Sequence, residues 1–186
     1  MSIEHISNFL IPEEFACTII NDKLILSNVY VLQLGIDPIE DAHGDIGIGI
    51  QKIKHLIGNY LQNSIFINQN NNLVKHLSEM ENNIVYLPCE PYDYYIGSIL
   101  FSKFVAITEK YFEINYIKVA SAVGDQVQYT ITSPYDCGLE LDGDYWWNID
   151  SVSTGQTNTI TWDELNLTPP PKFQPTVVQG GLSGNK

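Results

Sequence analysis

Residues 92–108 read YDYYIGSILFSKFVAIT, a sequence that predicts a helix apolar on almost every side. Pro91 precedes it, and proline is favoured at the first position of a helix, where its missing N–H has no partner to lose. The apolar residues recur at helical spacing: Tyr95, Ile96, Ile99, Leu100, Phe104 and Ile107, widened by Tyr94, Phe101 and Val105. Such a helix must be buried, so we expect residues 92–108 to form the central core helix.

Residues 46–62 show the one-sided pattern of an amphipathic helix. One face carries apolar residues and the other polar ones: Ile46, Ile50, Ile53, Ile57 and Tyr60 against Lys52, His55, Asn59 and Gln62. Asp45 is expected to cap this helix, because its side-chain oxygen can accept from a free backbone N–H. Two main helices, at about 46–62 and 92–108, are therefore predicted.

The remaining regular segments have the composition of strands. Near the N-terminus these are residues 15–20, 23–27 and 29–34, followed by short strands at 64–68 and 84–87 and a short helix at 73–80. A hairpin is expected at 111–132, because Val127, Tyr129 and Ile131 alternate with polar residues after a Gly124-Asp125 turn. Residues 145–152 and 157–162 are expected to extend this hairpin as a meander.

Together these segments predict an α+β fold, in which an antiparallel sheet packs against the two main helices. A length of 186 residues fits one domain, which we place at residues 1–165. Residues 166–186 are rich in proline and glycine and cannot bury a core, so they are expected to form an extended tail.

The charge balance excludes several classes of function. The chain has no arginine, nine lysines and twenty-two acidic residues, for a net charge of −13. Arginine supplies the planar fork that binds phosphate and reads base edges, and a strongly negative surface repels a nucleic-acid backbone. Direct binding to nucleic acid is not expected. An AT-rich genome, as in many phages, is an alternative explanation for the missing arginine.

The cysteines and the N-terminal sequence indicate a cellular location. Cys17, Cys89 and Cys137 are widely spaced and odd in number, which favours a reducing compartment over a disulfide framework or a zinc site. The first residues lack the basic segment of a signal peptide, and Lys103 interrupts the most apolar stretch well short of a membrane span. We expect a cytoplasmic protein without membrane contact, in the host cytoplasm if a phage encodes it.

Candidate partner-binding residues are aromatic and acidic, because exposed aromatic side chains bordered by acids make good protein-binding surfaces. We select these residues: Tyr92, Tyr94, Asp142, Asp144, Trp146 and Trp147. If residues 145–152 form a strand, Trp146 and Trp147 face opposite sides of the sheet. One would then be buried and the other covered by a helix, a partner or the tail.

Two metal sites and one nucleophile are weaker candidates. His43 and Asp45, with His76 or His55, could hold ferrous iron as a facial triad, although a helix cap at Asp45 is the simpler interpretation. A calcium loop is the second candidate, with these acids: Asp136, Glu140, Asp142, Asp144 and Asp150. Tyr145 stands where that loop needs glycine, which favours a solvated acidic loop.

Cys89 at a helix N-terminus could be a nucleophile, but Glu90 opposes a thiolate and a small buried residue is the simpler interpretation. No cofactor is predicted from these patterns, and no familiar catalytic motif is present.

The leading hypothesis is a small acidic interaction module that inhibits or neutralises a basic protein, as immunity proteins and phage anti-defence inhibitors do. One alternative is a phage-like structural or accessory subunit that docks through its C-terminal tail. Another is a metal-dependent enzyme that uses His43 and Asp45. A homo-oligomer is left open by the sequence.

Overall fold

A computed structural model describes residues 9–39, 46–79, 83–124 and 126–154. The long elements are two strands, then a helix, then a second helix and a strand: β1 (Phe9–Ile20), β2 (Ile25–Pro38), α1 (Ile46–Leu56), α3 (Asp93–Thr108) and β5 (Phe112–Ser121). The short elements are η1 (Ile57–Leu61), β3 (Ser64–Asn68), α2 (Val74–Leu77), β4 (Ile84–Leu87), β6 (Tyr129–Ile131) and η2 (Pro134–Cys137). The fold is α+β, as the sequence predicts.

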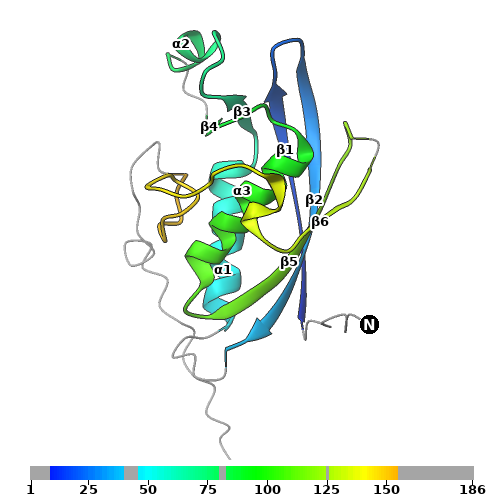
Figure 1. The fold of residues 1–186 in the computed structure, drawn as a ribbon, viewed down its shortest axis with the longest axis vertical. Coiled ribbons are helices and arrows are strands. Elements are labelled where there is room, and N and C mark those ends of the chain that lie inside the picture. Colours follow the sequence, from blue (N-terminus) through cyan, green and yellow to red (C-terminus); the bar gives the residue numbers. More distant parts are fainter. Residues whose placement is uncertain (1–8, 40–45, 80–82, 125, 155–186) are drawn as a thin grey trace, which may run out of the picture.

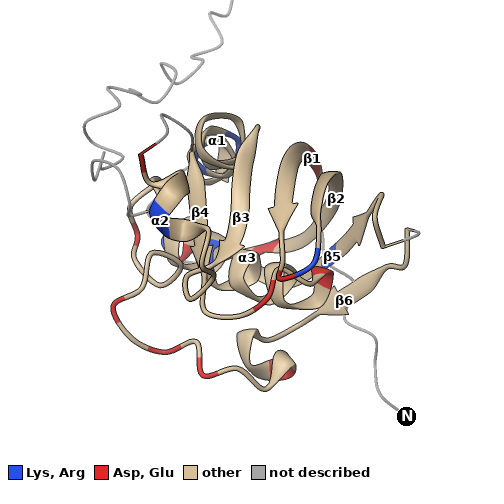
Figure 2. Ribbon diagram, turned by 90° about the horizontal axis from the view of Figure 1, so that it is seen from above, with Lys and Arg blue, Asp and Glu red and all other residues tan. Residues whose placement is uncertain are grey.

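The strands form one six-stranded sheet in the order β4-β3-β1-β2-β5-β6. The long β1–β2 hairpin lies at its centre, and α1 and α3 both lie on one side of it (Figure 1). Among the described residues, no long helix lies over the other side of β1, β2 and β5, as the view from above also shows (Figure 2). Within this part of the chain, helices therefore cover one face of the sheet and not the other.

Helix α3 is the centre of the core, in agreement with the pattern of residues 92–108. Its residues from Ile96 to Phe104 are all buried. Gly97 allows a close approach to the sheet, because a Cβ at this position would overlap the side chain of Ile131 and lie 3.0 Å from Cγ2 of Val119. Any larger residue here would push the helix away from β5 and β6.

Strand β2 shows why the sheet has two different faces. Tyr30, Leu32 and Leu34 alternate with Val29 and Val31 along the strand, so the first set points toward the helices and the second away from them. Tyr30 and Leu34 are fully buried, whereas Val31 is 53% exposed. The core therefore lies on the helix side of the sheet alone.

Two predictions about the sheet are wrong. It is mixed rather than antiparallel, because β3 runs parallel to both β1 and β4. The chain returns to the same end of the sheet before each of these strands, which the composition of residues 64–68 and 84–87 does not reveal. Residues 145–152 form turns and bends instead of a strand. Residues 157–162 lie outside the described part of the chain.

Strands 23–27 and 29–34 were expected to be separate, but they form one continuous strand, β2, and β1 begins at Phe9 rather than at residue 15. The remaining elements follow their predictions more closely. The helix expected at 46–62 is α1, continued by the π-helical turn η1, and the hairpin expected at 111–132 is β5 paired with β6. Asp45 and the tail at 166–186 lie outside the described residues. Within the described ranges, no helix combines the length and the apolar character needed to cross a bilayer.

Candidate functional site

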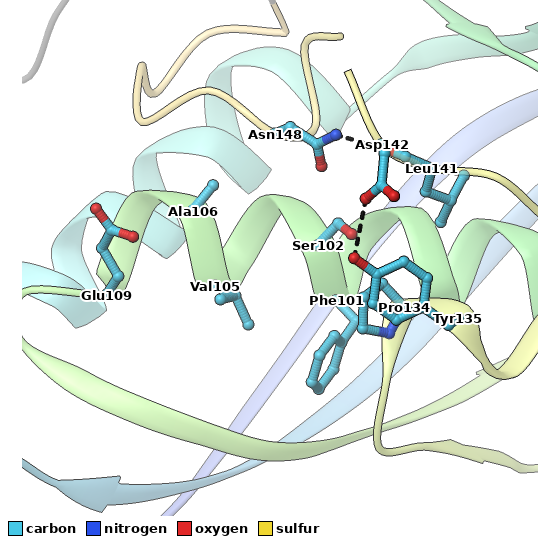
Figure 3. A pocket seen from close by; sticks show the side chains of 10 residues that line it. All are labelled: Phe101, Ser102, Val105, Ala106, Glu109, Pro134, Tyr135, Leu141, Asp142 and Asn148. Carbon is cyan, nitrogen blue, oxygen red and sulfur yellow. Dashed lines mark hydrogen bonds between the residues drawn. The ribbon is translucent and has the colours of Figure 1, made fainter. Parts of the chain in front are cut away.

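A cleft of about 260 Å³ lies between α3 and the segment 134–148. Figure 3 shows the ten residues that line it, with Glu109 and Asp142 at opposite ends and Val105 and Phe101 between them. The apolar side chains come mainly from α3, whereas Tyr135, Asp142 and Asn148 come from the segment above it. The result is an apolar floor with a carboxylate at each end.

The 3-10 turn η2 positions Tyr135 at this cleft. Ser133 and Asp136 form a capping box at the start of η2, and Gly138 ends it in the left-handed region at φ 68°. The Tyr135 hydroxyl, on a ring that is 59% exposed, donates to Oδ1 of Asp142 at 2.9 Å. This hydrogen bond, together with the charge of Asp142, raises the pKa of Tyr135. The phenol therefore stays protonated and holds the carboxylate in place.

Lys103 fixes the segment that forms the far wall of the cleft. Its side chain is fully buried, and Nζ donates to the carbonyl oxygens of Trp146 at 2.7 Å, Ile149 at 3.1 Å and Ser151 at 2.7 Å. Burial lowers the pKa of Lys103 to about 7, while the charge of nearby Asp150 acts in the opposite direction. In its charged form the side chain has three N–H donors for these three carbonyls, so this lysine organises a segment that has no regular secondary structure.

Trp146 and Trp147 complete the same anchor. The indole N–H of Trp146 donates to the Tyr86 carbonyl at 3.0 Å, and that of Trp147 donates to the Leu141 carbonyl at 2.9 Å. Their exposed fractions are only 7% and 2%. The expectation that they face opposite sides of a strand is wrong, because both rings turn inward from a loop.

The segment around the cleft is strongly acidic. The sequence has no lysine between Lys118 and Lys172, and the acids along the segment are spaced over the loop that follows β6, as Figure 2 shows: Asp136, Glu140, Asp142, Asp144 and Asp150. Asp142, Asp144 and Asp150 are exposed. Their potential therefore favours a cation at the cleft and repels an anion.

The candidate partner-binding residues do not form one surface. Asp142 lines the cleft and Asp144 lies in the same loop, but Tyr92 stands at the N-terminus of α3 with 59% of its surface exposed. Tyr94 is half-buried and its ring lies 5.6 Å from that of Tyr129. Of these four residues, only Asp142 therefore lines the cleft.

The metal and nucleophile candidates gain no support from the described residues. His43 and Asp45 lie outside them, and His76 is exposed on α2. Among the described residues, no three His, Cys, Asp or Glu side chains gather closely enough to hold a metal ion. Burial, with the charges of Cys137 and Glu90, raises the pKa of Cys89 to about 11, so this thiol is not an activated nucleophile.

Sequence reasoning missed Lys103 and Glu109 as residues of the site and missed the role of Tyr135. A lysine inside an otherwise apolar helix is the one signal that could have been used, because such a group needs buried acceptors. The acceptors are backbone carbonyls, and because every residue has one, the sequence does not indicate which carbonyls accept from Lys103.

The comparisons with known proteins identify no family. No family model matches this chain, and no curated protein matches it. Among solved structures, a 6-pyruvoyl tetrahydropterin synthase from Plasmodium vivax is similar, with a TM-score of 0.40, 12% sequence identity, and coverage of 66% of this chain and 94% of that one. A likeness of this size carries no information about activity.

Proposed function

We propose that the chain is a small acidic protein-binding module that receives a lysine or arginine side chain of a basic partner in the cleft beside α3. The observation that carries the proposal is the pairing of an apolar floor with carboxylates at both ends, Glu109 and Asp142. A basic side chain has the same two parts, an aliphatic stem and a cationic head. The stem would pack on Phe101 and Val105 while the head pairs with a carboxylate.

The size of the cleft favours a side chain over a small molecule. Sites for cofactors and drug-sized ligands usually enclose ~300–1,000 Å³, and this cleft has about 260 Å³. Tyr135 lines the cleft and is exposed, and in the same loop as Asp142 the exposed Tyr145 ring stacks on Trp147 with centroids 4.6 Å apart. Rigid aromatic rings of this kind add contact area at low entropic cost.

The net charge supports a role in fast association. A charge of −13 attracts a cationic protein over a distance and speeds its encounter. In our proposal the chain acts in the cytoplasm as an inhibitor or neutralising partner, whose binding covers a basic surface of its target. Because the attraction is electrostatic, the complex should weaken by roughly tenfold or more when salt is raised from low to physiological concentration.

The test compares charge-reversal variants in affinity capture from the native host or an infected culture. Glu109→Lys and Asp142→Lys should each lose a basic protein that the unaltered chain retains at low salt. Asp22→Lys is the matched control, since this exposed acid lies on the β1–β2 turn and does not line the cleft. It changes the net charge equally and should retain the protein.

A direct measurement uses a defined probe. Addition of an oligolysine peptide to the ¹⁵N-labelled chain should shift the amide signals of residues 101–109 and 134–148 before others. If Asp22→Lys and Asp142→Lys lost binding equally, net charge alone would explain the effect, and the cleft would not be a specific binding site. Recovery of capsid or tail components would instead support an assembly subunit.

A further inference from the structure

The C-terminal tail differs in charge from the rest of the chain. Residues 165–186 contain Lys172 and Lys186 and no acidic residue, although the whole chain has twenty-two acids. The segment 134–148, which forms one wall of the cleft beside α3, has four acids and no lysine. Opposite charges of this kind attract each other. The tail is therefore complementary in charge to the cleft.

The described part of the chain ends close to this cleft. The carbonyl oxygen of Ser151 accepts from Nζ of Lys103 at 2.7 Å, and Ser102, the neighbour of Lys103 on α3, lines the cleft. Thr154, the last residue that the structure describes, is buried and lies three residues beyond Ser151. Three residues span at most ~11 Å. The chain therefore leaves the described fold near the site.

The chain beyond Thr154 is long enough to bring a lysine back to the cleft. Lys172 lies eighteen positions after Thr154. A flexible segment of this length spans roughly 23 Å on average between its ends, and up to ~60 Å when it is fully extended. A connection of this length needs no strain. It also keeps the effective concentration of the tail at the cleft in the millimolar range.

The sequence around Lys172 suits this role better than the sequence around Lys186. Residues 169–171 are all proline, and Phe173 follows Lys172. Proline restricts its own backbone before any binding, so such a segment loses less conformational entropy on docking than the glycine-rich residues 180–184 would. Lys172 is therefore the better ligand of the two lysines.

We propose that Lys172 of the tail occupies the cleft in the free protein and must leave before a basic partner can bind, an inference that rests on the function proposed above. The aliphatic stem of Lys172 packs on Phe101 and Val105, and its ammonium pairs with Asp142. Oδ1 of Asp142 already accepts from the Tyr135 hydroxyl (Figure 3). A carboxylate offers about four acceptor positions, so both donors can be accommodated. The tail is then a built-in competitor of the partner.

The expected effect on partner binding is moderate. With an effective concentration of roughly 1–10 mM and a dissociation constant on the order of 1 mM for one side chain, the tail fills the cleft for half of the time or more. Its presence then weakens a competing ligand roughly two- to tenfold. Because the attraction is electrostatic, this difference should shrink as salt is raised.

Amide signals of the ¹⁵N-labelled full chain test the contact in the absence of any partner. Lys172→Gln should shift the signals of residues 101–109 and 134–148, and should lower the heteronuclear NOE of residues 170–174. Lys186→Gln is the matched control, because it removes the same charge from the same tail, and it should leave the cleft signals in place. If the two variants had the same effect on the cleft signals, the proposed contact would be overturned.

The reverse experiment changes the cleft instead of the tail. Asp142→Lys should release the tail and lower the heteronuclear NOE of residues 170–174 as Lys172→Gln does. Asp22→Lys is its control, because Asp22 lies on the β1–β2 turn and does not line the cleft. If the shifts caused by Lys172→Gln grew with protein concentration, the tail of a second copy would be the occupant, and the contact within one chain would be ruled out.

Titration with oligolysine separates this inference from the function on which it rests. Lys172→Gln should bind the peptide roughly two- to tenfold more tightly than the unaltered chain, and Lys186→Gln should bind it as the unaltered chain does. Equal affinity in all three chains, with the cleft signals shifting in each, would refute the tail contact and leave the proposed function standing. If the cleft signals failed to respond to the peptide even in Lys172→Gln, both proposals would fall.

Discussion

The two faces of the sheet differ in what they contribute to the protein. The inner face carries α1 and α3, and the buried Lys103 of α3 holds the backbone of residues 146–151. The outer face carries small or apolar side chains together with a few charged ones, such as Glu14, Glu113 and Lys118, and Val31 on it is 53% exposed. Among the described residues, the interactions that stabilise the fold are therefore concentrated on one side of the sheet. Three predictions test this division, beginning with the largest effect.

Of the three changes, Lys103→Met should cause the largest loss of stability. It leaves the carbonyls of Trp146, Ile149 and Ser151 without their donor inside the protein, and each unsatisfied group costs about 1 kcal/mol or more. We expect a loss of about 3 kcal/mol or more in the free energy of unfolding, measured by urea titration. Tryptophan fluorescence should shift to the red as Trp146 and Trp147 gain contact with water.

Lys110→Met is the control for this change. Lys110 is exposed two residues after α3, so its replacement should change the free energy of unfolding by less than about 0.5 kcal/mol. If Lys103→Met were as stable as this control, the three hydrogen bonds would do no more than offset the burial of the charge. The stability of the inner side would then come from the packing of α1 and α3 alone.

A smaller effect should follow from pH. The pKa of Lys103 is lowered to about 7 in the folded protein from the ordinary 10.5. Between these values the unfolded chain keeps a proton that the folded chain has released, so stability rises with pH in this window, by up to ~1.4 kcal/mol per unit. Below pH 7, Lys103 is charged in both the folded and the unfolded protein, so the folded state bears the full free-energy cost of burying this charge.

Urea titrations between pH 7 and 8.5 measure this slope. The window avoids higher pH, where the raised pKa values of Cys17 and Tyr30 act in the opposite direction. The difference in unfolding free energy between the unaltered chain and Lys103→Met should grow with pH. A constant difference would mean that Lys103 keeps its proton in the folded state across this range.

The smallest effect is expected on the outer face. Val31→Thr keeps a β-branched residue on the strand and changes an exposed position, so the protein should lose less than about 0.5 kcal/mol. Leu32→Ala, at the neighbouring position, removes a side chain that is 1% exposed and should cost about 2–5 kcal/mol. Similar losses at both positions in thermal or urea unfolding would contradict the division between the two faces.

The periodic parts of the fold could be predicted from sequence. The core helix begins at Asp93 and ends at Thr108, within one residue of the expected bounds. It could be predicted because a helix that is apolar on all sides is stable only when it is buried in the core. The residue pattern of a strand does not encode its direction, so the parallel pairing of β3 was missed. The segment 145–152 has strand-forming residues, but hydrogen bonds from Lys103 hold its backbone in turns.

The site was predictable only in part. The acids of the segment are visible in the sequence, and Asp142 does line the cleft. Glu109 directly follows α3 whereas Tyr135 lies in η2, and the two residues meet at the cleft only through packing. No local pattern brings together residues that are so far apart along the chain.

The hydrogen bond from Trp146 to Tyr86 has a consequence for aggregation. β4 is a terminal strand of the sheet, and the carbonyl of Tyr86 belongs to its unpaired edge. Exposed edges of this kind recruit further strands from other molecules. The indole occupies that edge and blocks strand pairing there. If residues 146–151 detached from Lys103, the edge of β4 would be exposed and could pair with strands of other molecules to form fibrils.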